Sequence, residues 1–182
     1  MTQSLVLNPA RLMPSNPIVR DIALRLYNSV SKLPIISPHG HTDPSWFAEN
    51  EPFSNATELL IKPDHYVFRM LYSQGISLAS LGIKSVANGV KVESDNRKIW
   101  RIFAENYYLF AGTPSRMWLD YVFVKVFGIN VTLNANTADH YYDHINAKLA
   151  TDEFLPRNLL DRFNIECIAT TESPLDDLRH HK

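Results

Sequence analysis

The chain has 182 residues, of which 45% are hydrophobic, so it can bury a substantial core and falls within the size range of one domain. Its 18 Lys and Arg residues against 19 Asp and Glu residues leave a formal net charge of -1, and no run of like charges favours a nucleic-acid or membrane partner. A single cysteine, Cys167, excludes an internal disulfide, and no secretory signal or run of about 18 apolar residues is present, which predicts a cytoplasmic protein.

The first predicted elements are a helix and a short strand. Asn16 followed by Pro17 is typical of a helix start, and apolar residues then recur at helical spacing. Residues 34–37 form an apolar run that is too short for a helix and is bounded by prolines, so they predict a buried strand. His39 and His41 come just after the carboxyl end of this strand.

Residues 46–163 have a mainly helical pattern without an obvious strand. A short helix at residues 156–162 precedes residues 165–171, which are rich in β-branched side chains and predict a second buried strand. Residues 86–92 could be extended. The strongest helices are predicted at residues 64–74, 96–110, 115–127 and 138–150.

The end of the chain predicts a further helix at residues 173–178. Ser173 is a suitable N-cap, Pro174 fits the first helical position, and carboxylates follow in the first turn. Two buried strands are few, because a sheet usually has about five or six strands and buried parallel strands need neighbours on either side. We therefore expect the chain to be cut off partway through a larger fold.

His39 and His41 are candidate metal ligands. In an extended segment, side chains at positions i and i+2 point the same way, and Gly40 between them leaves room for close approach. Histidines at this spacing are also common as exposed or hydrogen-bonded loop residues, but a place at the mouth of a buried strand, next to Asp43, favours zinc or a similar ion. A catalytic zinc generally takes three protein ligands, and no obvious third one lies nearby in the sequence.

A second candidate lies at the start of the helix predicted over residues 64–74. If Asp64 caps this helix, His65 and Tyr66 occupy its first turn and Arg69 follows one turn later. Such a polar face at a helix N-terminus favours an anion, for example a carboxylate. On residue pattern alone, a partly exposed helix whose His and Tyr only pack and hydrogen-bond is the more common arrangement.

Other notable side chains receive structural interpretations. The aromatic residues between positions 100 and 127 recur at helical spacing, which favours a core or a subunit contact. His140 and His144 lie four positions apart but lack the Glu of the zinc-protease motif, so a solvated helix face is favoured. His180, His181 and Cys167 are assigned no chemistry.

Four motifs occur in a distinctive order along the chain. They are LPIISPHGHTDP at residues 33–44, PDHY at 63–66 with RMLY at 69–72, GTP at 112–114 with Trp118-Leu119, and Thr170-Thr171 with Pro174 and DDL at 176–178. In this order they resemble the glucuronate (uronate) isomerase family of the amidohydrolase superfamily. The resemblance spans almost the whole chain, and its first two motifs are the specific ones.

The resemblance implies an α/β fold, a partial (β/α)8 TIM-type barrel with a large helical insertion at about residues 45–163. Residues 1–182 would be the N-terminal part of a single metal-dependent barrel domain. The implied reaction interconverts D-glucuronate with D-fructuronate, and D-galacturonate with D-tagaturonate, by proton transfer between C2 and C1. His39 and His41 would bind a divalent metal, which we predict to be zinc, whereas His65 and Tyr66 would bind the hexuronate and act in catalysis, with Tyr66 as acid/base at C2. The role of Arg69 is left open.

Two departures from the family pattern limit this implication. Thr171-Glu172-Ser173-Pro174 stands where the family commonly has Thr-Thr-Asp-Asp-Pro, which removes one acidic position. The family also takes further catalytic and metal-binding residues from later strands, and a full barrel needs at least about 200 residues. We therefore expect an N-terminal fragment that is inactive alone, and a full-length protein that is a homo-oligomer.

Two alternatives remain open at this point. One is a metal-dependent hydrolase of the same superfamily, and the other is a non-catalytic remnant that binds a metal or a sugar acid.

Overall fold

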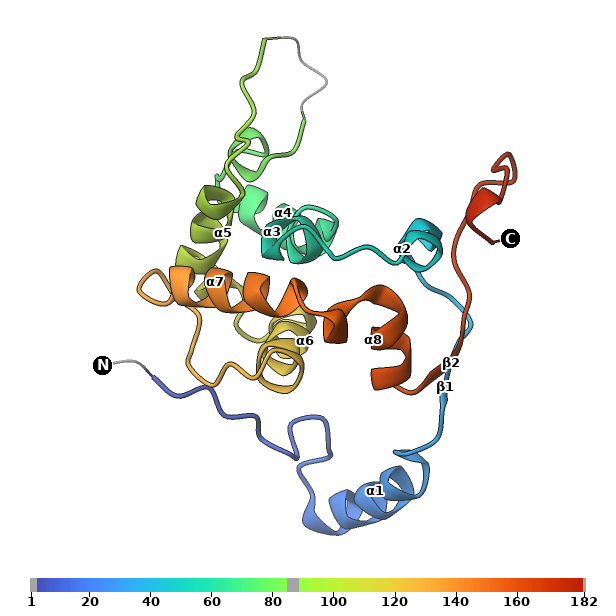
Figure 1. Ribbon diagram of the computed structural model, residues 1–182. Coiled ribbons are helices and arrows are strands. Elements are labelled where there is room, and N and C mark those ends of the chain that lie inside the picture. Colours follow the sequence, from blue (N-terminus) through green and yellow to red (C-terminus); the bar gives the residue numbers. More distant parts are fainter. Residues whose placement is uncertain (1–2, 85–88, 182) are drawn as a thin grey trace. The chain divides into compact units, whose positions relative to one another are not determined.

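The computed structural model describes residues 3–84 and 89–181, which divide into two compact units (Figure 1). The helical unit consists of Phe53–Ala150 together with the N-terminal segment up to Leu7. The strand unit consists of Asn8–Pro52 and the segment from Thr151 onward. The two candidate motifs thus belong to different units, His39 to the strand unit and His65 to the helical unit.

The two predicted strands form a small parallel sheet within the strand unit. In this sheet β1 (Ile35–Ser37) pairs with β2 (Ile165–Ile168), with Ile36 opposite Cys167 and Ser37 opposite Ile168. The fold is therefore mixed α/β, as predicted, with one two-stranded sheet among the described residues. The other elements of this unit are α1 (Pro17–Val30), α2 (Pro44–Glu49), α8 (Pro156–Arg162) and the short 3₁₀ helices Asp152–Phe154 and Arg179–His181.

The helical unit is built from short helices around an aromatic core. Trp100, Phe103 and Phe123 are fully buried, and the ring centroids of Trp100 and Phe103 are 5.4 Å apart, so this part of the aromatic cluster forms a core as predicted. Tyr108, Trp118 and Tyr121 of the same cluster are exposed. The elements are α3 (Ala56–Leu60), α4 (His65–Ser73), α5 (Asn96–Glu105), α6 (Pro114–Tyr121) and α7 (Ala138–Leu149), the 3₁₀ helices Ala79–Leu81 and Tyr107–Phe110, and the π-helix Val122–Val126.

The predicted caps explain where two of these helices begin. The Asn16 side chain accepts the backbone N–H groups of Ile18 and Val19 at 3.0 and 3.2 Å, and α1 starts at the following proline. The Asp64 carboxylate accepts those of Tyr66 and Val67 at 2.8 and 3.3 Å. Since the first N–H groups of a helix have no partner within it, a side-chain acceptor at this point fixes the start.

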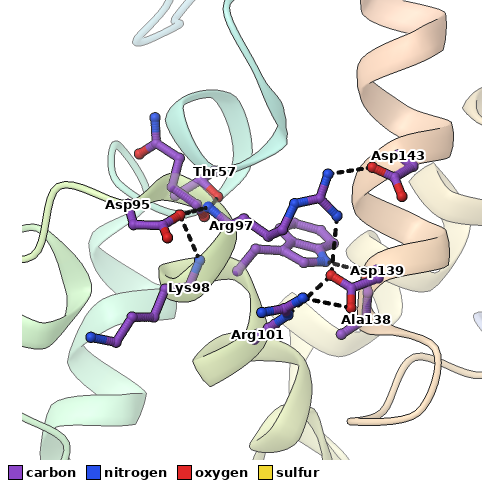
Figure 2. Close-up of polar contacts among 10 residues, drawn as sticks. Thr57, Asp95, Arg97, Lys98, Arg101, Ala138, Asp139 and Asp143 are labelled. Carbon is purple, nitrogen blue, oxygen red and sulfur yellow. Dashed lines mark hydrogen bonds and ion pairs between the residues drawn. The ribbon is translucent and has the colours of Figure 1, made fainter.

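A network of charged side chains joins α5 to α7 on the surface of the helical unit (Figure 2). Arg101 donates to both carboxylate oxygens of Asp139 at 3.0 and 2.8 Å, and Arg97 donates to Asp139 at 3.1 Å and to Asp143. Beneath it, the Trp100 indole N–H donates to the carbonyl of Ala138 at 2.9 Å. The same pair of helices is thus joined by buried packing and by exposed ion pairs.

The prediction that both strands are buried is wrong for this structure. The side chain of Ile36 is 64% exposed, and Ile35 and Leu33 are also exposed. A buried parallel strand needs partners on both edges and cover on both faces. Within residues 3–84 and 89–181, β1 and β2 pair only with each other.

The predicted helix at residues 173–178 is also wrong. The Ser173 backbone N–H donates to the Asp176 carboxylate at 2.7 Å, and the Asp176 N–H donates back to the Ser173 carbonyl at 3.0 Å. These bonds close a tight turn, and Leu178 then has a positive φ of 54° that a right-handed helix cannot contain. A carboxylate that bonds back to the backbone competes with helix formation.

Other predicted segments differ in their bounds, and the strand expected at residues 165–171 ends at Ile168. The helix expected at 96–110 ends at Glu105, because the side-chain amide of Asn106 donates to the Ile102 carbonyl at 2.8 Å and a 3₁₀ turn follows. The helix expected at 115–127 changes to a π-helix after Tyr121. Of the segment that could be extended, residues 86–88 lie outside the described residues and 89–92 form no strand.

Candidate active site

The segment from His39 to His41 is held at the carboxyl end of β1 by hydrogen bonds to the chain that leaves β2. The Ala169 N–H donates to the Ser37 carbonyl and the Thr171 hydroxyl donates to the Gly40 carbonyl, both at 2.8 Å. A Cβ atom at Gly40 would lie 3.1 Å from the Ala169 carbonyl oxygen. Gly40 therefore permits the close approach of these two segments.

His39 and His41 point their imidazoles at the same place, as the i, i+2 spacing predicts. Their Nε2 atoms lie 3.1 Å apart, and their rings stand at 85° with centroids 4.8 Å apart. Zn–N bonds of about 2.0–2.1 Å at tetrahedral angles separate two ligand nitrogens by about 3.3–3.4 Å. The pair therefore fits two positions on one zinc ion, and without an ion the same contact is a hydrogen bond when one ring carries the Nε2 proton.

A complete metal site is not assembled within the part of the chain that the structure describes. No group of three or more His, Cys, Asp or Glu side chains is arranged there to hold an ion. Because two nitrogens leave a zinc ion short of the usual three or four protein ligands, His39 and His41 can supply part of a coordination shell.

Asp43, which follows the pair, has a structural task. Its carboxylate accepts the backbone N–H of Ser45 at 2.9 Å and so caps α2. Hydrogen bonds from the Ser45 side chain and backbone hold the pKa of the Asp43 carboxyl below its ordinary value. The carboxylate is thus charged and engaged with the helix that begins directly after the histidine segment.

A pocket of about 620 Å³ lies beside His41, between the histidine segment and the chain beyond β2. Glu172 and His181 both line this pocket, and both contact the Thr170 hydroxyl, Glu172 through its carboxylate at 2.9 Å and His181 through Nε2 at 2.8 Å. Glu172 belongs to the loop whose family motif has lost one acidic position, yet its carboxylate has a defined partner here. Sequence reasoning assigned no chemistry to His181, and only the turn at residues 173–176 brings it back to this loop.

His65 and Tyr66 lie side by side in the first turn of α4, within the helical unit. Their ring centroids are 4.5 Å apart at an angle of 33°, and Tyr66 is 69% exposed. Arg69, one turn further on, is also exposed. The three polar side chains at the start of α4 are therefore exposed, and their binding of an anion stays a prediction.

The contacts of the remaining histidines and of the cysteine do not indicate a catalytic or metal-binding role. His144 Nε2 lies 2.7 Å from the Phe127 carbonyl oxygen and thereby fixes the end of the π-helix to α7. The His140 and His144 rings are 6.0 Å apart. Cys167 is exposed on β2, not buried as the strand prediction implied.

Comparison with known proteins shows the family to which the chain belongs. The family model described as glucuronate isomerase matches residues 14–182. The chain belongs to the glucuronate isomerase family.

Relatives in this family resemble the chain over nearly its whole length. It is 62% identical over 181 residues to a protein named uronate isomerase from Sphingopyxis alaskensis, and 64% identical over 177 residues to one from Xanthomonas euvesicatoria. The crystal structure of glucuronate isomerase from Caulobacter crescentus has 57% sequence identity and a TM-score of 0.92 over 98% of the chain. Uronate isomerase from Thermotoga maritima has 27% identity and a TM-score of 0.81 over 97%.

The chain is much shorter than these members of the glucuronate isomerase family. It covers 37% of the Sphingopyxis and Xanthomonas proteins, 37% of the Caulobacter chain and 36% of the Thermotoga chain.

Proposed function

We propose that this chain contributes to an aldose-ketose isomerase that interconverts D-glucuronate with D-fructuronate and D-galacturonate with D-tagaturonate. The observation that carries the proposal is the convergence of His39 and His41, whose Nε2 atoms are 3.1 Å apart at the end of a parallel strand. Membership of the glucuronate isomerase family and the exposed His65–Tyr66 pair support the same reaction.

The proposed fold is the N-terminal part of a (β/α)8 barrel. Two adjacent parallel strands, joined by a long helical segment, are the beginning that such a barrel requires, and its functional groups lie where strands end at the carboxyl side. His39 and His41 follow β1 at that side. In this proposal the helical unit is an insertion between the first and second strands.

The reaction moves one proton from C2 to C1 of the open-chain sugar. A base removes the C2 proton while the C1 aldehyde oxygen gains one, which gives an enediol; proton loss from the C2 hydroxyl and protonation at C1 then complete the ketose. We assign Tyr66 as the acid/base at C2, with His65 beside it to bind the substrate. A divalent ion on His39 and His41, for which we propose zinc, would polarise the substrate's oxygens.

The test compares the 182 residues with a chain extended to the length of its relatives. We expect the extended chain to isomerise glucuronate and the 182-residue chain to show no turnover. In the extended chain, Tyr66→Phe should lower kcat by about 10²- to 10⁴-fold, the range for loss of an acid/base group. Tyr72→Phe, an exposed tyrosine on the same helix, is the matched control. Turnover by the 182 residues would contradict the expectation that they are inactive alone. An active Tyr66→Phe would contradict the assignment of Tyr66 as the acid/base.

Zinc binding tests the contribution of the 182 residues separately. If His39 and His41 bind zinc, a hundredfold excess over Kd stabilises the folded chain by about 2.7 kcal/mol and raises Tm. His39→Ala and His41→Ala should each abolish this rise, whereas His140→Ala, an exposed histidine on α7, should not. An equal rise in the double variant His39→Ala/His41→Ala would exclude this pair as the zinc site.

A metal-dependent hydrolase is the second candidate, because the convergent histidine pair fits metal-activated hydrolysis equally well. Paired assays of the extended chain on hexuronates and on amides or lactones separate the two reactions. A non-catalytic protein that binds a metal or a sugar acid would bind zinc or glucuronate and turn over neither set.

We further propose that the full-length protein is a cytoplasmic homo-oligomer. Among the described residues, no helix combines the length and apolar character that a membrane span needs. Size-exclusion chromatography with light scattering on the extended chain would determine the oligomeric state.

A further inference from the structure

We propose that Asn50 and Arg157 position the His39–His41 pair by completing each other's helix ends, which fixes α2 to α8. This inference rests on the proposed function insofar as the pair binds a metal. Neither residue belongs to the motifs that carry the family resemblance.

The contact joins two helices that are distant in sequence. The Arg157 guanidinium donates from Nε to the Phe47 carbonyl at 2.7 Å and from its terminal nitrogen to the Ala48 carbonyl at 2.9 Å. In return, the Asn50 side-chain oxygen accepts the Arg157 backbone N–H at 3.0 Å. Carbonyls at the end of α2 and an N–H at the start of α8 have no partner within their own helices, so each residue supplies what the other helix lacks.

Both residues are suited to this exchange of hydrogen bonds between the two helix ends. Asn50 ends α2 with a φ of 55°, a left-handed conformation that asparagine tolerates better than most residues. Arg157 lies in the first turn of α8, where a positive charge opposes the helix dipole, but its guanidinium reaches the carboxyl end of α2, where a positive charge is favoured. A basic residue at this unfavourable helix position is the sequence feature that indicates a partner outside α8.

The histidine segment depends on α2 for its position. The α2 helix begins at Pro44, three residues after His41, has six residues and contains no buried one. A helix this short does not form by itself, so its place depends on its caps and on contacts with other elements, among them α8 and the 3₁₀ helix Arg179–His181. Asp43 fixes its start, and the exchange between Asn50 and Arg157 fixes its end.

These contacts connect both ends of the histidine segment to α8. From Arg157, α8 runs to β2, which pairs with β1, and β1 leads to His39. The other way, Asn50 ends the α2 helix that follows His41. The two Nε2 atoms can stay 3.1 Å apart only while both ends of their segment are held, one by the sheet and the other by α2.

The test follows the imidazole nitrogen signals of His39 and His41 by NMR in the 182-residue chain at one fixed pH. We expect Arg157→Ala and Asn50→Gly to move the signals of both rings, since Asn50→Gly removes the acceptor but keeps the left-handed backbone. Asn50→Asp keeps the acceptor and should leave the signals in place, and Arg157→Lys should restore them partly. Unchanged signals from β2 and from Phe154, the buried aromatic residue of the strand unit, establish that this unit remains folded in each variant.

The control is Arg162→Ala, at the other end of α8. Arg162 lies over the Phe154 ring at 4.9 Å and pairs with Glu153 at 3.3 Å, so its loss perturbs the packing of α8 against the residues that precede this helix. The inference is wrong if Arg157→Ala leaves both histidine signals unmoved, or if Arg162→Ala moves them equally.

Zinc titration of the same variants provides the second readout. Arg157→Ala should weaken zinc binding about tenfold, the lower end of what residues that orient metal ligands contribute, and Arg162→Ala should not. Unaltered zinc affinity in Arg157→Ala would overturn the inference. If the unsubstituted chain binds no zinc while the histidine signals respond as expected, the positioning role holds and the metal role of the pair fails.

Discussion

The helical unit and the strand unit bury their apolar side chains to very different extents. In the helical unit, α5 and α7 pack Trp100, Phe103 and Tyr141 into a core from which water is excluded. In the strand unit, α1 has no buried residue, and its apolar side chains, among them Leu26 at 66%, are exposed. Phe154 is the one large hydrophobic side chain of this unit that is buried among the described residues.

The difference shows that an apolar pattern specifies which face of an element must be covered, but not by what. The apolar residues of both α1 and α5 recur at helical spacing. Only α5 has a partner helix within the described residues that covers its apolar face. Under the proposed barrel, cover for α1, β1 and β2 would come from further strands and helices of the kind that the longer relatives have room for.

The largest expected effect is on hydrogen exchange. Amides in α5 and α7 should exchange on the order of a thousandfold more slowly than those in α1, because exchange in a core helix requires global unfolding whereas an uncovered helix opens locally. Exchange followed by mass spectrometry measures this ratio. Equal protection in the two units would show that α1 is covered in solution, and the comparison between the units would then fail.

Truncation of a core residue should separate the units energetically. Phe103→Ala removes a fully buried ring and should lower the free energy of unfolding by about 3–5 kcal/mol. Leu26→Ala, the matched truncation on exposed α1, should change it by less than about 0.5 kcal/mol. Urea denaturation of both variants measures the difference, and similar losses would contradict the burial contrast.

A polar contact inside the helical unit should have an intermediate effect. The Tyr107 hydroxyl donates to Asp120 at 2.9 Å, and Arg116 donates to the same carboxylate at 2.8 Å. Tyr107→Phe should therefore lower the free energy of unfolding by about 1–2 kcal/mol at neutral pH. Tyr108→Phe, an exposed neighbour, is the control.

The pH dependence of Tyr107→Phe gives a second check. Burial, followed by the charge of Asp120, raises the pKa of Tyr107 well above its ordinary value of 10.0. The folded phenol stays neutral at a pH at which the unfolded one ionises, so the stability that this phenol contributes is present below pH 10 and is lost as pH rises above it. The Phe variant should lack this part of the alkaline destabilisation; an identical alkaline profile would contradict the burial of the hydroxyl.

The smallest effect is expected from the exposed network of Figure 2. Hydrogen bonds from Arg101 and then Arg97 lower the pKa of Asp139, so its contribution to stability is present above the ordinary carboxyl pKa and is lost as pH falls through the lowered value. Asp139→Asn should lower Tm slightly at neutral pH and not at low pH or high salt. A large, salt-independent loss would mean that the network is not solvated.

Local chemistry allowed much of this protein to be predicted from its sequence alone. Asn16 and Asp64 determine helix starts through bonds to residues two and three positions away. The convergence of His39 and His41 follows from the two-residue period of an extended backbone. These features depend on atoms that are close in sequence, so they could be predicted without knowledge of the fold.

What only the tertiary structure decided depends on residues far apart in the chain. The exposure of Ile36 depends on which strands are neighbours, and the turn that brings His181 to Thr170 depends on how Asp176 bonds back to Ser173. The exchange between Asn50 and Arg157 spans 107 positions. Such contacts form only when the fold brings separate segments together, and the local pattern of either segment does not identify which residue its partner is.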